Sequence, residues 1–173
     1  MKNSIPVLSE KALMASEKGD HIKAADYYRE ALKIAPDSPS LYYNLALELD
    51  ASGNTDGALN ALSQALEYNS SDPDIFAEKG RILLDAGEYE EAEENIASAL
   101  KLDPEHPYAL NNMGVLSFLK KEYDDALIYF LDAVKVKKDF ADAWFNLADT
   151  YSVIGDDRGE KAARKKFEKL NER

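Results

Sequence analysis

The feature that most constrains this chain of 173 residues is an internal repeat of 34 residues. Three series of small side chains recur at this spacing: Ala24, Ala58, Ala92 and Ala126; Ala31, Ala65, Ala99 and Ala133; and Ala12, Ala46, Gly80, Gly114 and Ala148. A fixed period of roughly 20 to 50 residues is typical of proteins whose repeats stack on their neighbours. The spacing gives five repeats, and we expect them to form one domain over residues 1–173: 5–38, 39–72, 73–106, 107–140 and 141–173.

Within each repeat, numbered place 1 to place 34, the apolar residues predict helices. They recur at spacings of three and four, as in Tyr42, Leu45, Ala46 and Leu49, and never alternate over a sustained run. On the second half of a repeat, places 20, 24 and 27 share a face in the same way. We therefore expect these places, together with places 4, 7, 8 and 11, to form the core, with the small residue at place 8 opposite the alanine at place 20.

Proline, glycine and capping residues mark where the helices begin and end. Place 1 holds Pro39, Pro73 and Pro107, and Ser38 and Asp72 precede two of these prolines as expected N-caps. Place 15 holds Gly19, Gly53, Gly87 and Gly155, which suit the left-handed residue that follows a helix. The first helix is thus predicted over places 1 to 14, and the second ends near place 32, where Pro36 and Pro104 stop it.

Two segments of the chain carry the residue pattern of a known family. They are GEYEEAEENIASALKLDP at residues 87–104 and AWFNLADTYSVIGD at residues 143–156, and the second supplies Trp144, Leu147, Ala148 and Tyr151 in the family's order. With the 34-residue spacing, this pattern resembles the tetratricopeptide repeat over essentially the whole chain. The resemblance implies an all-α fold, a right-handed superhelix of antiparallel helix pairs, whose first helices line a concave face that holds peptides or protein segments.

Helical rotation predicts which residues line that face. Because each residue turns the helix by about 100°, places 2, 5, 6, 9 and 12 lie opposite the core places of the first helix. Apolar or aromatic side chains among them are candidate anchors, and the asparagines at place 6 offer a donor and an acceptor to a peptide backbone. The candidate peptide-binding residues are Tyr43, Asn44, Leu47, Glu78, Arg81, Tyr108, Asn111, Asn112, Val115, Phe118, Phe145, Asn146 and Asp149.

Charge predicts the kind of partner. The formal net charge is −12, and the predicted face carries one cation, Arg81, against six carboxylates: Glu10, Asp50, Asp74, Glu78, Asp142 and Asp149. A surface of one sign attracts the opposite charge, so we expect a basic or neutral protein segment with apolar anchors, and no nucleic acid. The family's carboxylate clamp, which holds acidic chaperone C-termini, is disfavoured because Glu78 stands where the clamp needs a cation.

Catalytic, metal and cofactor sites are not predicted. The chain has no cysteine and two histidines, His21 and His106, both at expected turns or helix starts. The alternation of Asp50, Ser52, Asn54 and Asp56 imitates a calcium loop, but the required glycine is misplaced and the bidentate glutamate is missing. We therefore expect a non-catalytic interaction scaffold without a cofactor.

The location of the chain is also predicted from what its sequence lacks. It contains no apolar run of roughly 18 residues and no evident leader, so we expect no membrane span and a cytoplasmic location by default.

The two ends of the chain leave alternatives open. Val7 and Met14 lie on the helix flank that later repeats use against a preceding repeat, so a homo-oligomeric scaffold is the alternative to the favoured monomer. An accessory subunit of an enzyme complex is a third reading.

Residues 158–173 carry a net charge of +4 and resemble a polar capping helix. This basic cap is also a candidate for nucleic-acid or acidic-lipid binding, although a solvated cap is favoured. Its apolar stripe of Ala163, Phe167 and Leu170 fits the repeat only if about three residues are inserted in the preceding turn.

Overall fold

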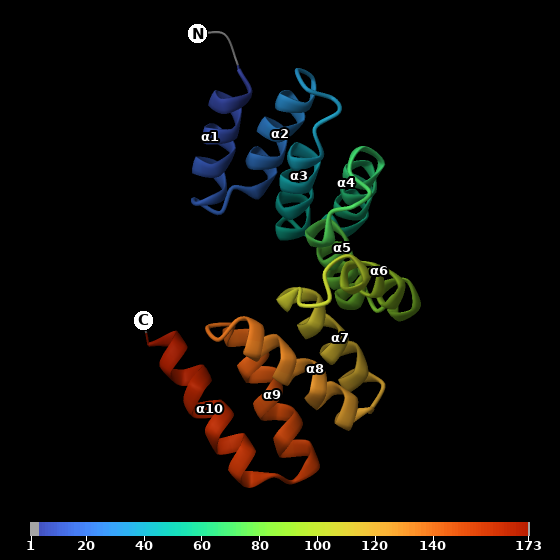
Figure 1. The fold of residues 1–173 in the computed structure, drawn as a ribbon. Helices are drawn as coiled ribbons and strands as arrows, with labels where there is room; N and C mark the ends of the chain where they lie inside the picture. The colour runs from blue at the N-terminus through green and yellow to red at the C-terminus, as the bar shows by residue number, and fades with distance from the viewer. Residues whose placement is uncertain (1–3, 173) are drawn as a thin grey trace. The chain divides into compact units, whose positions relative to one another are not determined.

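The computed structural model describes residues 4–172, and these residues are organised as consecutive helices (Figure 1). Ten helices and no strand occur among them: α1 (Ile5–Ser16), α2 (His21–Leu32), α3 (Pro39–Ala51), α4 (Thr55–Tyr68), α5 (Pro73–Ala86), α6 (Tyr89–Leu102), α7 (Pro107–Leu119), α8 (Tyr123–Val136), α9 (Ala141–Ile154) and α10 (Asp157–Asn171). The predicted all-α fold is confirmed. Each repeat supplies one odd-numbered and one even-numbered helix.

The turns within the repeats follow the predicted glycine pattern. Gly19, Gly53, Gly87 and Gly155 have φ between 75° and 82°, the left-handed region that favours glycine. Lys121 takes the same conformation in the fourth repeat, with φ of 64°. Every even-numbered helix therefore begins at place 17. Those of the first four repeats end at places 28 to 30, slightly before the expected place 32.

The two expected N-caps behave differently. The Asp72 side chain accepts a hydrogen bond from the Asp74 backbone N–H at 3.1 Å and so caps α5. Ser38 occupies the N-cap position of α3, but its hydroxyl makes no capping bond. Side-chain caps that the repeat pattern did not single out stand before even-numbered helices, where Asp20, Asn54 and Asp156 accept backbone hydrogen bonds.

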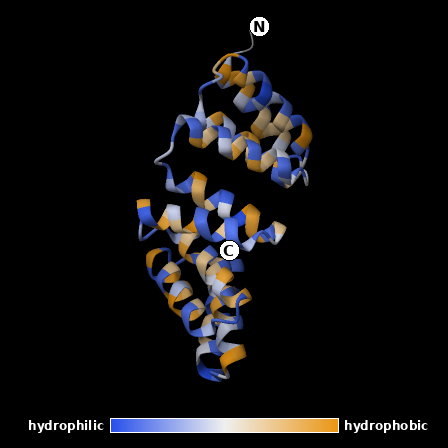
Figure 2. Ribbon diagram, turned by 90° about the vertical axis from the view of Figure 1, so that its right-hand side faces the viewer, coloured by the Kyte–Doolittle hydropathy of each residue, from blue (hydrophilic) through white to orange (hydrophobic). Residues whose placement is uncertain are grey.

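The chain forms two compact units, an N-terminal unit that ends at Ile75 and a C-terminal unit that begins at Phe76. In the N-terminal unit, α1 packs on α2, α2 on α3 and α3 on α4. In the C-terminal unit, one apolar cluster joins α7, α8, α9 and α10 and includes Phe130, Leu147 and Ala163. Apolar and polar stretches interleave along the individual helices, as one buried face per helix requires (Figure 2).

The repeated small residues lie where the packing prediction placed them. All eight alanines at places 20 and 27 are 0% exposed, and the small residues at place 8 are buried. A Cβ added to Gly80 would lie 2.5 Å from Ile96 Cγ1, and one added to Gly114 would lie 2.6 Å from Phe130 Cε1. Real Cβ atoms essentially never approach so closely, so paired helices meet tightly at place 8. The predicted burial of the small residues is confirmed, but the nearest partners of Gly80 and Gly114 stand at place 24, and not at place 20.

The expected insertion before the last helix is wrong. Helix α10 begins at Asp157, the same place as the other even-numbered helices, so the turn has no extra residues. Ala163 is 1% exposed, and a Cβ on Gly159 would lie 2.6 Å from Tyr151 Cδ1. Gly159 and Ala163 stand at places 19 and 23, one place before places 20 and 24, which make the contacts in the other repeats. Helix α10 thus packs with a face turned by about 100°, one residue of helix rotation.

Candidate functional site

The residues predicted to line a binding face form a small pocket in the C-terminal unit, which we call the Phe118 pocket. Three consecutive helices supply its walls: Val115, Phe118 and Leu119 from α7, Phe130 from α8, and Asn146 and Asp149 from α9. Its volume is about 90 Å³. Small-molecule and cofactor sites usually need roughly 300 to 1,000 Å³. The Phe118 pocket therefore has room for a side chain of a partner but not for a cofactor.

The walls of the Phe118 pocket combine apolar carbon with two polar groups. Phe118 is half-buried and packs edge-on against Tyr123, with ring centroids 5.3 Å apart. The buried Phe130 ring closes the apolar side. Asn146 and Asp149 supply an amide and a carboxylate. This arrangement suits a side chain with an apolar stem and a polar or positively charged end.

Asp149 already has a partner on the last helix. Its Oδ1 lies 3.2 Å from an Arg164 guanidinium nitrogen, and both side chains are substantially exposed. Arg164 also donates to Glu160 at 2.7 Å. This hydrogen bond is the main cause that lowers the pKa of Glu160 and raises the pKa of Arg164. Exposed ion pairs contribute little net stability, so a cation of a partner can compete for Asp149.

Two of the asparagines at place 6 make hydrogen bonds between repeats, a role that their repetition did not predict. Asn112 Nδ2 donates to the Ala77 carbonyl at 3.0 Å, and Asn146 Nδ2 donates to Asn111 Oδ1 at 3.0 Å. Both bonds run from place 6 of one repeat to place 5 of the repeat before it. Asn111 and Asn112 are only 8% and 7% exposed. Three of the predicted lining residues, Asn111, Asn112 and Asn146, thus connect neighbouring repeats, and Asn146 is only half-buried.

Other predicted residues of the C-terminal unit lie outside the Phe118 pocket. Tyr108 is exposed and packs against Phe140 at 5.1 Å, with Lys137 Nζ 4.4 Å from the Tyr108 ring centroid. Phe145 is exposed and packs against Phe167 of α10 at 5.4 Å. Both rings are thus exposed on the surface while each packs against a neighbouring side chain.

The single predicted cation, Arg81, is engaged within its own helix. Its guanidinium donates to Glu78 Oε1 at 2.7 Å and to Asp85 Oδ2 at 2.7 Å. Two carboxylates therefore surround one positive charge. This part of the surface is not suited to holding an acidic peptide terminus.

In the N-terminal unit, the predicted residues Tyr43, Asn44 and Leu47 are all half-buried on α3. A second pocket, of about 140 Å³, lies beside Tyr43, and we call it the Tyr43 pocket. Its lining comprises Pro39, Ser40, Tyr43, Asn69, Asp72, Asp74 and Ile75. Asn44 and Leu47 do not line it. The carboxylates of Asp72 and Asp74 give the Tyr43 pocket an acidic edge.

Sequence reasoning missed several residues that shape these surfaces. Leu119 and Phe130 complete the Phe118 pocket, and Phe167 supports Phe145. Place 24, where Phe130 stands, was assigned to the core; Phe130 is buried there and also lines the Phe118 pocket. Within residues 4–172, no cluster of residues suited to hold a metal ion occurs, and no helix is long and apolar enough to cross a membrane.

Comparison with protein families finds matches over nearly the whole chain. The model of the cilia and flagella-associated protein 70 middle TPR-like domain matches residues 42–171. A tetratricopeptide repeat model matches residues 5–38. The two matches together cover the five repeats that the sequence spacing defines.

Curated relatives and solved structures agree with these matches. The chain is 32% identical to tetratricopeptide repeat protein 8 of Caenorhabditis elegans over 105 residues, 60% of this chain and 21% of that protein. It is 27% identical to human protein O-mannosyl-transferase TMTC3 over 135 residues, 76% of this chain and 15% of that protein. The chain thus spans about a fifth or less of these relatives.

Among solved structures, PilF of Pseudomonas aeruginosa matches with a TM-score of 0.84 at 21% identity, covering 96% of this chain and 76% of that one. At this identity the likeness concerns the fold alone.

Proposed function

Since the chain belongs to the tetratricopeptide repeat family, we propose that it is a non-catalytic interaction module that binds a protein segment on the surface of its first helices. The family fold generally mediates protein–protein interaction. The observation that carries the proposal is the Phe118 pocket, where four residues predicted from helical rotation alone meet in one cavity: Val115, Phe118, Asn146 and Asp149. We expect this pocket to take one anchoring side chain of the partner.

We propose that the partner segment is basic or neutral and carries apolar anchors. The chain has a net charge of −12, and Asp149 borders the Phe118 pocket. A lysine, arginine or methionine side chain combines the apolar stem and the polar or polarizable end that the pocket suits. Arg81 is paired with Glu78 and Asp85, which supports the exclusion of an acidic chain terminus as ligand.

The proposal is tested by selecting peptides from a random display library on the full chain. We expect the selected peptides to carry lysine or arginine beside a large apolar residue. Phe118→Ala should weaken their binding by about tenfold or more, as removal of a central anchor usually does. Ile128→Ala, at an exposed apolar position on α8, is the matched control and should leave binding unchanged.

A second variant separates a binding effect from a folding effect. Asp149→Asn preserves the shape of the side chain and removes its charge. It should weaken basic peptides and leave neutral ones unaffected. Selected basic peptides that bind both Phe118→Ala and Asp149→Asn as tightly as the native chain would rule out the proposed surface.

A further inference from the structure

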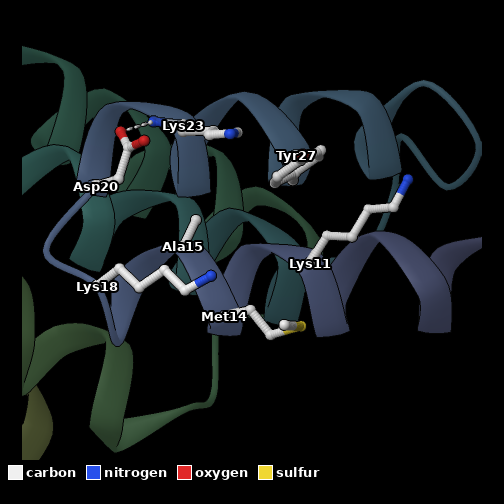
Figure 3. Close-up of a pocket in the computed structure, with 7 residues that line it drawn as sticks. All are labelled: Lys11, Met14, Ala15, Lys18, Asp20, Lys23 and Tyr27. Carbon is white, nitrogen blue, oxygen red and sulfur yellow. Dashed lines mark hydrogen bonds between the residues drawn. The ribbon is translucent and has the colours of Figure 1, made fainter.

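A depression between α1 and α2 is lined by three lysines in a chain whose net charge is −12. Its lining comprises Lys11, Met14, Ala15, Lys18, Asp20, Lys23 and Tyr27, and its volume is about 370 Å³ (Figure 3). We call it the lysine pocket. It contains none of the residues predicted to line the peptide-binding face. It lies wholly within the N-terminal unit.

Three cations surround the lysine pocket although the chain as a whole is strongly acidic. Lys11, Lys18 and Lys23 border it, and Lys11 Nζ lies 5.7 Å from the Tyr27 ring centroid. The one carboxylate, Asp20, serves as the N-cap of α2 and accepts from the Lys23 backbone N–H at 3.2 Å. The local charge is therefore positive, and it favours an anionic group.

The floor of the lysine pocket is apolar. Met14 is 50% exposed and lies between Lys11 and Lys18 along the chain, while Ala15 is buried and Tyr27 is half-buried (Figure 3). A flexible thioether beside an aromatic ring adapts to a range of apolar side chains. An occupant that matches both features needs an apolar side chain flanked by carboxylates.

The repeat itself indicates that this face accepts a helix. Lys11 and Met14 correspond, 34 residues on, to Leu45 and Glu48 of α3. In the second repeat α2 packs on α3, Leu45 is buried, and Glu48 Oε2 lies 2.8 Å from His21 Nδ1 of α2. On α1, by contrast, Lys11 is exposed and Met14 is 50% exposed. The place that Met14 occupies in the first repeat thus contacts a preceding helix in the second.

We propose that the lysine pocket binds an amphipathic helix of a partner protein, one that carries an apolar residue flanked by glutamate or aspartate. A nucleic acid fits poorly because a polyanion is repelled by the net charge of −12, whereas a short acidic helix needs only the three local lysines. The C-terminal stretch of another copy fits poorly as well, because residues 158–173 are basic. This surface is independent of the Phe118 pocket, and the two select partners of opposite charge.

The test measures binding of a fluorescein-labelled helical peptide whose apolar stripe of leucines is flanked by glutamates. The full chain is titrated in fluorescence anisotropy, beside a second peptide in which glutamines replace the glutamates. Lys11→Glu/Lys18→Glu should weaken the glutamate peptide by about tenfold or more. Lys33→Glu/Lys101→Glu changes two exposed lysines elsewhere by the same net charge, and it should leave binding nearly unchanged.

The contribution of the apolar floor to binding is tested with a separate variant. Met14→Ser should weaken both peptides, because it removes the exposed part of the floor without changing the charge. Three results would overturn the proposal: equal loss in the two double variants, equal affinity for the glutamate and glutamine peptides, or tighter binding of a duplex oligonucleotide than of the glutamate peptide. Phe118→Ala should not alter this binding, so a failure here is distinct from a failure of the Phe118 pocket.

Discussion

The contact between Gly114 and Phe130 gives the sharpest test of how the repeats pack. A Cβ at Gly114 would lie 2.6 Å, 2.7 Å and 3.0 Å from the Cε1, Cδ1 and Cζ atoms of Phe130, whose side chain is almost fully buried. In an open helix, Gly→Ala stabilises by about 1 kcal/mol. Here contacts this short force the buried ring to shift, and overpacking costs about 1 to 3 kcal/mol. We expect Gly114→Ala to destabilise the C-terminal unit by about 1 kcal/mol.

Phe130→Val supplies the matched background because valine lacks the Cδ1, Cε1 and Cζ atoms that a Cβ at residue 114 would meet. In that background Gly114→Ala should stabilise by about 1 kcal/mol, which makes the coupling in a double-mutant cycle about 2 kcal/mol. Urea unfolding followed by fluorescence reports on this unit directly, since Trp144 is the sole tryptophan of the chain and packs against the same apolar cluster. Stabilisation by Gly114→Ala in the native background, or an equal effect in both backgrounds, would refute the packing argument.

Three further predictions concern the helices and their ends. Ala92→Leu should lower the melting temperature more than Ala97→Leu, because Ala92 is fully buried and Ala97 is exposed on the same helix, and equal shifts would contradict the assignment. Lys121→Gly should raise stability by about 1 kcal/mol in urea unfolding, since Lys121 has a φ of 64°, and a decrease would show that the residue is unstrained. The hydrogen bond from Arg164 lowers the pKa of Glu160 below 4.5, so its stabilising contribution is present above that pH and is lost as the pH falls through the lowered pKa. Glu160→Gln should therefore lose less thermal stability than the native chain on acidification, and an equal loss would argue against the pairing.

Much of the fold can be predicted from the sequence because residues that make equivalent packing contacts recur every 34 residues. Ala24 and its equivalents at intervals of 34 residues mark where two helices meet, and all of them are fully buried. The glycines at place 15 fix the turns in the same way. The register of α10 did not follow, because a helix with one apolar stripe satisfies several rotations about its axis. Only the close approach of Gly159 to Tyr151 selects one of them.

The sequence predicts the directions of the side chains at the candidate site, but not how deeply each is buried. Helical rotation placed Phe118 and Asp149 on a common face, and they share a pocket. The same rotation gave Asn112 an outward direction. Its exposure, however, depends on how near the preceding helix lies, and α5 lies near enough for Asn112 to donate to the Ala77 carbonyl. A side chain's direction follows from its own helix, whereas its burial depends on the neighbouring one.

The most direct measurement of the proposed function is an NMR titration of the isotopically labelled chain with a selected basic peptide. Binding on the first-helix surface predicts that the largest backbone amide shifts occur on α7 and α9, around Val115, Phe118, Asn146 and Asp149. Shifts confined to exposed residues of the even-numbered helices, with those four amides unmoved, would contradict the account.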